Sequence, residues 1–418
     1  MTDAPADPGD RHLAAQYEAF PYPARDPRDE AKRLIIGSPS HLREIDHWIF
    51  GARRRASQPL RALFAGGGTG DGTIMLAQQM ARAQRPGSVT WLDRSGAARR
   101  LAEARAAVRK LDNLRFEEGS LLGLPGSGLG PFDYIDCCGV LHHLPDPLAG
   151  LRALVSVLAP GGGLGLMVYA PHGRTGVYML QDALRLLAPA DQAPAARVEV
   201  ARRLWKQVPD TAWLKRNPWL TDHISGGDAG IYDLLLNPRD AAFTVPQLAA
   251  LVAAAGLRIA SWVEPVRYYP DSYLPDPKLR ARTALMSPLE RAALAEAVTG
   301  NMGIHIVYCL RAEAPEVPPP WEDAEAVPVL REMDGAALAR GLPRDGTIPV
   351  TFDGLRVNLP LPRLAGAILQ RVDGRRSFGA IADELAANGI PRDAFWRELA
   401  ALRRSMEAMN RLLITAPA

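Results

Sequence analysis

The sequence predicts an α/β protein with a doubly wound, mostly parallel sheet, a helical insertion and a small α+β domain at the C-terminal end. Two stretches carry this prediction. In the first, the apolar residues 61–65 run into a cluster of glycines, and a helical pattern then starts at Thr73. In the second, residues 132–169 read as a buried strand, a loop, an amphipathic helix, a glycine turn and another buried strand. Strands that alternate with helices in this way form parallel sheets.

Seven short apolar segments are the expected strands of this sheet. Helical patterns lie between most of them. The seventh segment is expected to close the sheet as an antiparallel hairpin strand. The segments are residues 61–65, 89–93, 114–116, 134–139, 163–169, 257–264 and 304–311.

The chain of 418 residues exceeds the size of one ordinary hydrophobic core, so we expect two domains with embellishments. Helical patterns near residues 178–187 and 194–207 interrupt the succession of strands and indicate an insertion. A stretch rich in Pro, Glu and Ala indicates a linker. The predicted organisation is an arm at 1–36, disordered to about residue 12, a main domain at 37–312 with the insertion at 171–243, a linker at 313–328 and a C-terminal domain at 329–418.

Composition argues against several classes of function. The formal net charge is +3 and no Lys/Arg cluster is interleaved with aromatic residues, so nucleic acid is not an expected partner. Cys137, Cys138 and Cys309 lie in predicted buried strands and offer neither a disulfide framework nor the spacing of metal ligands. No segment has the length of a membrane span, and the polar start lacks a secretory signal. We therefore expect a cytoplasmic protein without a metal or a membrane partner.

Glycines follow the first predicted strand. Because glycine has no side chain and tolerates positive φ, the turn at Gly66, Gly68 and Gly70 lets the backbone pass close to a ligand. Asp93 ends the next strand, where its carboxylate can accept hydrogen bonds from two ribose hydroxyls. Together these features predict an adenosine site. The glycine spacing is tighter than the G-x-G-x-x-G of nicotinamide-binding folds.

In order and separation, these motifs resemble those of the class I S-adenosylmethionine-dependent methyltransferases. Residues 65–70 look like the glycine turn of that family, residues 133–146 like its fourth-strand segment, and the strand after residues 158–162 like its fifth. The resemblance implies a Rossmann-like domain that binds S-adenosylmethionine and releases S-adenosylhomocysteine. The cofactor-binding residues it implies are Ala65, Gly66, Gly68, Gly70, Asp71, Asp93, Ser120, Leu121 and Gly139.

Two positions depart from the pattern of this family. Phe64 stands where the family often has an acid that helps to hold the methionine amino group, and Ser120 stands where an acid usually reads the adenine amino group. Ser120 can still form a hydrogen bond, and the backbone amide of Leu121 is available to adenine. Asp71, just past the glycines, is either a source of the missing negative charge or a plain helix N-cap.

The N-terminal arm carries the motif Tyr-x-x-Phe-Pro-Tyr-Pro at residues 17–23. Aromatic residues that alternate with prolines favour an extended path. A similar segment precedes the catalytic domain in several groups of bacterial methyltransferases. Tyr17 and Tyr22 are therefore candidates for a lid over the cofactor or for substrate contact. Packing of these aromatic side chains onto the domain surface is the alternative.

Methyl transfer is an in-line displacement, and it needs a base only where the acceptor must lose a proton. The candidate catalytic residues are His142 and His143, after the fourth strand, and Tyr169, at the end of the fifth. The insertion is expected to form the acceptor pocket, because α/β enzymes place substrate recognition at the carboxyl ends of strands. A self-packed helical cap is the alternative. The candidate substrate residues are Tyr17, Tyr22, Tyr178, Trp213, Trp219, His223 and Tyr232.

The C-terminal domain combines strand-like residues 348–359 with three helical segments. It resembles small winged-helix-like units, including those of some bacterial protein-lysine methyltransferases. Its acidic residues dilute the basic ones, so we favour substrate docking or homodimerisation as its role. The expected function is methyl transfer to an unidentified acceptor, with a protein or peptide side chain favoured. A small-molecule methyltransferase and a non-catalytic scaffold are the alternatives.

Overall fold

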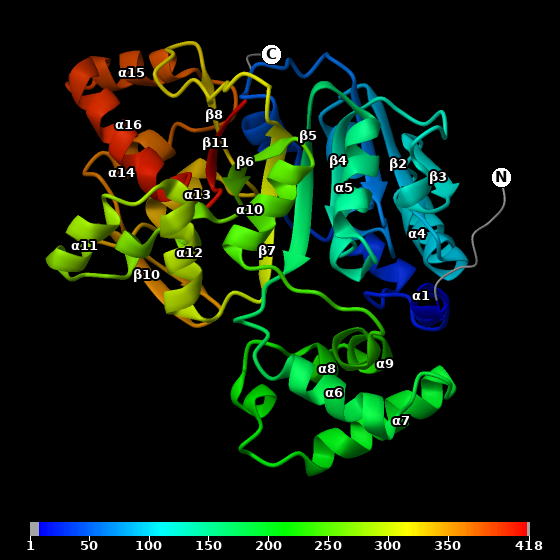
Figure 1. Cartoon of the computed structure of the whole chain (residues 1–418). Helices are drawn as coiled ribbons and strands as arrows, with labels where there is room; N and C mark the ends of the chain where they lie inside the picture. The colour runs from blue at the N-terminus through cyan, green and yellow to red at the C-terminus, as the bar shows by residue number, and fades with distance from the viewer. Residues whose placement is uncertain (1–7, 416–418) are drawn as a thin grey trace.

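The computed structural model describes residues 8–415, and its main body is a seven-stranded sheet flanked by helices (Figure 1). The strands are β1 (Leu60–Ala65), β2 (Gly87–Asp93), β3 (Leu114–Glu118), β4 (Phe132–Cys138), β5 (Leu158–Tyr169), β6 (Leu257–Trp262) and β7 (Ile304–Arg311). Their order is β3-β2-β1-β4-β5-β7-β6. All neighbours up to β5 pair in parallel, and β7 runs antiparallel to both β5 and β6. The predicted sheet with its antiparallel final strand is confirmed.

The central strands are buried on both faces because their side chains alternate between two apolar layers. In β1, Ala62 and Phe64 belong to one layer, and Leu63 and Ala65 belong to the other. The first layer is completed by helix α3 (Asp71–Arg82) and the second by α5 (Pro147–Ser156) and α10 (Val245–Ala254). Helix α4 (Gly96–Val108) covers Trp91 of β2.

The N-terminal arm begins as a helix, α1 (Pro8–Ala19), and continues in an extended path to the short helix η1 (Pro27–Ala31). The prediction of disorder up to residue 12 is therefore wrong for residues 8–12, while residues 1–7 lie outside the described part. The prediction of an extended path for the motif at residues 17–23 is also wrong for residues 17–19, which belong to α1. Proline interrupts a helix, and the first proline of this motif is Pro21. The residues before it are therefore free to continue α1 as far as Ala19. Helices α2 (Leu42–Glu44) and η2 (Ile45–Ile49) then lead to β1.

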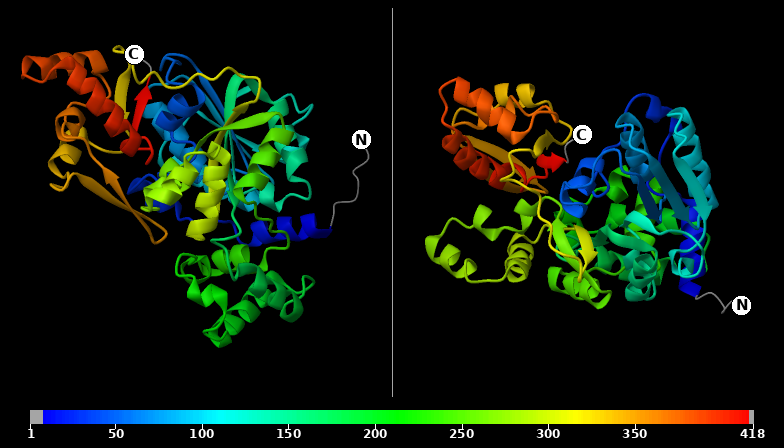
Figure 2. Two further views of the ribbon diagram at one scale, coloured as in Figure 1. Left: turned by 60° about the vertical axis from the view of Figure 1, so that its left-hand side comes forward. Right: turned by 90° about the horizontal axis from the view of Figure 1, so that it is seen from above.

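The insertion is a helical unit that hangs below the sheet (Figure 1 and Figure 2, left). Its own small core includes Val177, Leu184, Val198 and Leu235. Its helices are α6 (Val177–Leu187), α7 (Pro194–Gln207), η5 (Trp213–Arg216), α8 (Asp222–Ser225), α9 (Gly227–Ile231) and η6 (Tyr232–Leu236). Four helices join β6 to β7, namely η7 (Pro265–Tyr268), η8 (Pro270–Ser272), α11 (Pro277–Thr283) and α12 (Pro288–Thr299).

The C-terminal unit has a core of its own and lies beside the β6–β7 edge of the sheet (Figure 1 and Figure 2). It begins with β8 (Val327–Leu330), which pairs antiparallel with the last strand, β11 (Leu412–Thr415). The first strand thus starts at Val327, inside the predicted linker. Between these strands lie α13 (Gly335–Arg340), the hairpin β9 (Thr347–Phe352) and β10 (Leu355–Pro360), and the helices α14 (Ala365–Leu369), α15 (Phe378–Ala387) and α16 (Arg392–Met406). Within residues 8–415, no helix is long and apolar enough to cross a membrane.

Candidate functional site

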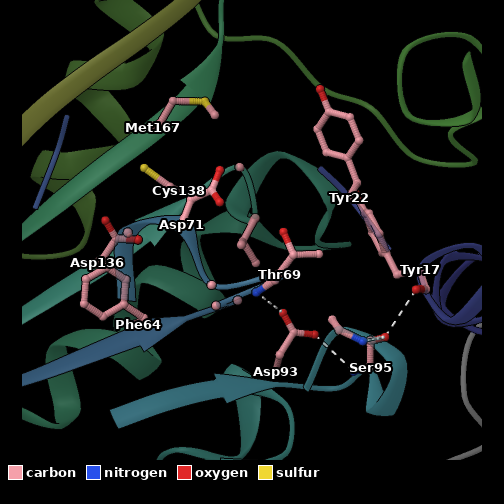
Figure 3. Close-up of a pocket in the computed structure, with 18 of the residues that line it drawn as sticks. Tyr17, Tyr22, Phe64, Thr69, Asp71, Asp93, Ser95, Asp136, Cys138 and Met167 are labelled. Atoms are coloured by element: carbon pink, nitrogen blue, oxygen red, sulfur yellow. Dashed lines mark hydrogen bonds between the residues drawn. The ribbon is translucent and has the colours of Figure 1, made fainter. Parts of the chain in front are cut away.

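A cavity of about 460 Å³ lies at the carboxyl ends of β1, β2 and β4 (Figure 3). Small-molecule sites occupy about 300–1,000 Å³ and in open α/β sheets lie at this edge. The walls of the cavity come from the N-terminal arm, the glycine turn, the ends of β2 and β4, and the insertion. Segments that are far apart in the chain therefore meet around one space.

The glycine turn after β1 forms one wall of the cavity. The amides of Gly66 and Gly67 donate to the Leu92 carbonyl at 2.8 and 3.1 Å, which ties the turn to β2. At Gly68 φ is +49°, in the left-handed region that favours glycine. A Cβ atom at Gly67 would lie 2.1 Å from Cδ1 of Trp91. The turn therefore requires glycine for its own packing as well as for the approach of a ligand.

Asp93 ends β2 and faces the cavity (Figure 3). Its Oδ2 accepts a hydrogen bond from the Gly68 amide at 2.8 Å, and its Oδ1 accepts one from the Ser95 amide at 3.0 Å. Burial raises the pKa of this carboxyl, and the backbone hydrogen bonds act in the opposite direction. A carboxylate has about four acceptor positions, so Asp93 retains capacity for two hydroxyl groups. This geometry fits a ribose diol.

The residues assigned to the cofactor from the sequence lie, with one exception, around this cavity. The exception is Ala65, whose side chain is buried in the apolar layer with Leu63. The Ser120 hydroxyl accepts a hydrogen bond from the Leu122 amide at 3.2 Å and caps the short helix η3 (Leu121–Gly123). Those that line the cavity are Gly66, Gly68, Gly70, Asp71, Asp93, Ser120, Leu121 and Gly139.

Asp71 does not supply a free negative charge, contrary to one of the two expectations for it. Nε of Arg25 lies 2.9 Å from Oδ1 of Asp71, and Nη1 of Arg105 lies 2.7 Å from the same oxygen. Arg25 also binds Oδ2 through Nη2. The alternative, an N-cap, is wrong as well, because Gly70 caps α3 and Asp71 is its first residue. Two arginines from distant segments thus neutralise this carboxylate.

A second acid, Asp136, lies at the other end of the cavity, beside Phe64, Cys138 and Met167 (Figure 3). Its Oδ2 accepts a hydrogen bond from the Ser40 hydroxyl. Burial raises the pKa of its carboxyl to about 6. Sequence reasoning missed this residue. The available signal was an acid inside an otherwise apolar strand.

The N-terminal arm passes over the mouth of the cavity. Tyr17 and Tyr22 both line it. The Thr69 hydroxyl donates to the Pro23 carbonyl at 2.9 Å, and the Ser95 hydroxyl donates to the Tyr17 carbonyl at 3.2 Å. The arm is therefore fastened both to the glycine turn and to the segment after β2, where a lid over the cofactor would lie.

Asp233 joins two of the candidate tyrosines. Its Oδ1 accepts from the Tyr17 hydroxyl at 3.1 Å and its Oδ2 from the Tyr169 hydroxyl at 3.0 Å. The carboxyl lines the cavity from the π-helical turn η6, and such turns are frequent at functional sites. Burial raises its pKa. Asp233 is not among the residues predicted from the sequence, although an acid within the apolar residues 231–236 is a usable signal.

The two candidate histidines, both on the short helix η4 (Leu141–His143), have different surroundings. His143 lines the cavity, and its Nδ1 lies 2.7 Å from the Arg239 carbonyl oxygen. Because a carbonyl only accepts, Nδ1 carries the proton, and Nε2 is the acceptor in the neutral ring. His142 is 0% exposed, stacks on Tyr169 at a centroid distance of 3.8 Å and lies outside the lining. Burial holds its pKa well below the usual range, so of the two only His143 is placed to reach an acceptor.

The other candidates in the insertion lie away from this cavity. Three of them pack against neighbouring side chains of the insertion, one packs against the N-terminal arm, and one packs against the C-terminal unit. The pairs are Tyr178 with Arg174, Trp213 with Arg216, His223 with Trp205, Tyr232 with Phe20, and Trp219 with the hairpin turn at Gly354.

Known proteins share the fold and part of the sequence. A methyltransferase domain family matches residues 63–164, from β1 into β5. An uncharacterized protein of Synechococcus is 28% identical over 320 residues, 74% of this chain and 73% of that protein. A ubiquinone biosynthesis O-methyltransferase of Albidiferax ferrireducens is 33% identical over 115 residues, 28% of this chain and 42% of that enzyme. The solved structure of PKMT2 from Rickettsia typhi in complex with AdoHcy has a TM-score of 0.62 at 14% identity, and the match covers 91% of this chain and 75% of that one.

The matched domain contains the strands that build the cavity. Its glycine turn and Asp93 fit the adenosine part of S-adenosylmethionine, and that cofactor, when bound, supplies an electrophilic methyl group. The chain spans less than half the length of the ubiquinone enzyme, so that likeness concerns only part of that enzyme. The domain match, the sheet order and the fitted adenosine site together show that this chain contains an S-adenosylmethionine-dependent methyltransferase domain with a Rossmann-like sheet.

Proposed function

We propose that this methyltransferase acts on an amine of a protein or peptide side chain. The observation that carries the proposal is Asp233, a carboxylate that lines the cavity between Tyr17 and Tyr169. A carboxylate and aromatic faces together attract a cation. The same carboxylate disfavours an anionic acceptor, because like charges repel in a partly desolvated site.

An amine must lose a proton before it can attack. Lysine-type amines are protonated at neutral pH, and a positioned base assists their deprotonation. His143 lines the same cavity, and its Nε2 is the free acceptor because Nδ1 faces the Arg239 carbonyl. In this proposal Asp233 and the tyrosines hold the amine, and His143 accepts its proton.

The C-terminal unit supports a macromolecular acceptor. The turn of its β9–β10 hairpin, at Gly354, packs against Trp219 of the insertion. The insertion in turn supplies Asp233 to the cavity. A protein docked on the C-terminal unit would therefore lie beside the element that holds the acceptor. We propose docking of the protein acceptor as the role of this unit.

A hydroxyl group on a small molecule is the second candidate acceptor. It is favoured by the likeness to a ubiquinone biosynthesis O-methyltransferase and by the arm, which narrows access to the cavity. A hydroxyl could donate a hydrogen bond to Asp233 or to Nε2 of His143. The two candidates differ in the size and the chemistry of the product, so one experiment distinguishes them.

The test uses the full chain with methyl-labelled S-adenosylmethionine. One arm offers a library of lysine-containing peptides beside the same peptides with glutamine in place of lysine, and the other offers the small-molecule fraction of a cell extract. We expect label in lysine peptides only, recovered after acid hydrolysis as an N-methylated amino acid. Label that appears only in an extractable small molecule would replace this proposal with the O-methyl alternative.

Asp233→Asn is the informative variant. We expect its kcat/KM for the labelled peptide to fall by about tenfold to a hundredfold, because one charge-assisted contact to the amine is lost. Its affinity for S-adenosylhomocysteine should be unchanged. Asp228→Asn is the matched control, since Asp228 belongs to the same insertion but forms an exposed pair with Arg202. Equal activity of both variants would contradict the role of Asp233.

A further inference from the structure

The end of the cavity opposite Asp93 contains the buried carboxylate of Asp136. Asp136 is 6% exposed, and within residues 8–415 no Arg, Lys or His side chain is found in an ion pair with it. Asp71, at the same cavity, differs because Arg25 and Arg105 both bind it. A buried charge without a partner is costly. A cationic group of a ligand would therefore stabilise the Asp136 carboxylate.

The strand register places Asp136 where the amino-acid part of the cofactor must end. Asp136 of β4 lies directly opposite Phe64 of β1. β1 separates β4 from β2, so the strands of Asp136 and Asp93 are about 10 Å apart. S-adenosylmethionine joins its adenosine through sulfur to a chain that carries an ammonium group. If Asp93 holds the ribose, that chain extends away from β2, and Figure 3 shows Asp136 and Phe64 together on the side opposite Asp93 and Ser95.

The Asp136 carboxylate is held in place by a built network. Ser40 is fully buried, and its φ of +84° is unusual for a residue other than glycine. Its hydroxyl donates to Asp136 and lies 2.9 Å from the Tyr134 hydroxyl, while its amide donates to the Tyr308 hydroxyl at 3.1 Å. The Cys138 amide and thiol also interact with the carboxyl. In this orientation the carboxylate can still accept a hydrogen bond from a ligand.

We propose that the Asp136 carboxylate binds the ammonium group of the amino-acid chain of S-adenosylmethionine and S-adenosylhomocysteine, a role that the uncharged Phe64 cannot fill. This inference rests on the cofactor alone and is independent of the acceptor. Burial raises the pKa of Asp136 to about 6, which reflects the missing countercharge. A bound ammonium supplies that charge and favours the ionised carboxylate.

The test measures binding of two ligands to the full chain by calorimetry. S-adenosylhomocysteine carries the ammonium group, whereas 5′-methylthioadenosine has the same adenosine and thioether without the amino acid. At pH 8, Asp136→Asn should weaken binding of S-adenosylhomocysteine by at least about tenfold and leave 5′-methylthioadenosine within about twofold. The matched control is Asp133→Asn, on the same strand, where the carboxylate pairs with Arg61 outside the cavity. It should change neither affinity.

Equal weakening of both ligands by Asp136→Asn would assign Asp136 a structural role and overturn the proposal, and so would no weakening at all. A second measurement needs no variant. In the wild-type protein, the affinity for S-adenosylhomocysteine relative to that for 5′-methylthioadenosine should fall as the pH drops from 7 to 5. Protonation of Asp136 removes the charge that binds the ammonium group. The other groups that face Asp136 are Tyr134 and the Cys138 thiol, whose pKa values burial raises, and, through Ser40, Tyr308 and Glu44. A ratio that stays constant over this range would overturn the proposal even if the variant failed to fold.

Discussion

Asp93 and Asp136 are carboxylates at opposite ends of one cavity, and their local partners differ. Two backbone amides, those of Gly68 and Ser95, donate to Asp93. Asp136 accepts a hydrogen bond from the Ser40 hydroxyl and interacts with the amide and thiol of Cys138. Asp93 is thus built into the turn that shapes the site, whereas Asp136 depends on a segment far away in the sequence. Substitutions at the two positions should therefore have different consequences.

Asp93→Ala should abolish useful cofactor binding. The carboxylate would otherwise accept two ribose hydroxyls, and loss of two charge-assisted hydrogen bonds lowers affinity by at least about a hundredfold. The variant should also be less stable, because the Gly68 and Ser95 amides lose their acceptor. Calorimetry with S-adenosylhomocysteine and urea unfolding measure the two effects. Asp93→Asn keeps one acceptor oxygen and should lose less affinity and less stability. An Asp93→Ala variant that binds like the wild type would refute the ribose assignment.

Asp136→Asn should stabilise the ligand-free protein at neutral pH. Burial raises the pKa of Asp136 from 3.8 to about 6, so the folded protein retains a proton that the unfolded chain releases between these values. The free energy of unfolding therefore falls as the pH rises through this window, and above pH 6 the ionised group costs about 3 kcal/mol. Asparagine cannot ionise and removes this cost. Urea unfolding should show the variant more stable than the wild type at pH 8 but not at pH 4.

Asp133→Asn, on the same strand, should change the free energy of unfolding at pH 8 in the opposite direction. Although burial opposes it, hydrogen bonds from Arg61 hold the pKa of Asp133 below its usual value. That carboxylate therefore stabilises the protein at pH 8, and the stabilisation is lost as the pH falls through its lowered pKa. Asp133→Asn should be less stable than the wild type at pH 8. If both variants shifted stability in the same direction, the assigned environment of Asp136 would be wrong.

At the scale of elements, the part of the N-terminal arm between α1 and η1 passes over the cavity and is fastened there by polar contacts. Arg25 binds Asp71 at the start of α3, and Thr69 binds the Pro23 carbonyl. The side chains of Arg25 and Asp71 are 32% and 26% exposed, so solvent screens their attraction in part. The arm is therefore a candidate for opening when the cofactor enters or leaves.

Arg25→Ala should loosen the arm and speed cofactor release. A partly exposed ion pair contributes about 1 kcal/mol, which corresponds to a rise of about fivefold in the dissociation rate of S-adenosylhomocysteine. Stopped-flow displacement measures this rate. Arg28→Ala is the matched control, because Arg28 pairs with the neighbouring Asp26 at the surface of the arm. Equal rates for the two variants would mean that the Arg25–Asp71 pair does not restrain the arm.

At the scale of the whole molecule, the C-terminal unit braces the segment that positions Ser40 against Asp136. Nε of Arg331, just after β8, lies 2.9 Å from Oε1 of Glu44, and its Nη2 donates to the Gly37 carbonyl at 2.9 Å. Glu44 also accepts a hydrogen bond from the Tyr308 hydroxyl at 2.6 Å. The two domains are thus joined through a buried ion pair next to the cofactor cavity. We expect cofactor affinity to depend on this junction.

Arg331→Met should lower the free energy of unfolding by about 3 kcal/mol, because it leaves the buried Glu44 without its cation. It should also weaken binding of S-adenosylhomocysteine through Ser40. Urea unfolding and calorimetry provide the two values. The double variant Arg331→Met/Glu44→Gln should recover part of the stability. Arg376→Met is the control, since its partners Asp373 and Glu384 are exposed within the C-terminal unit; an equal loss in both single variants would contradict this role of the junction.

Features that depend on neighbouring residues in the sequence were predictable. The seven strands follow from apolar segments and their periodicity, and the turn at residues 66–70 follows from glycines that tolerate left-handed φ values. The position of Asp93 at the end of a strand brought it to the cavity, because parallel strands present their carboxyl ends at one edge of a sheet. For these features, local conformation and sheet geometry were sufficient.

Features that depend on contacts between distant segments required the tertiary structure. Asp71 lost its expected role because Arg25 and Arg105, far from it in the sequence, fold onto its carboxylate. The opposition of Asp136 to Phe64 comes from the register of two strands that are separated by about 70 residues. The sequence by itself determined the fold and the adenosine end of the site. Only the packing of distant segments decided which buried acids keep a free charge, because charge balance depends on what lies nearby in space.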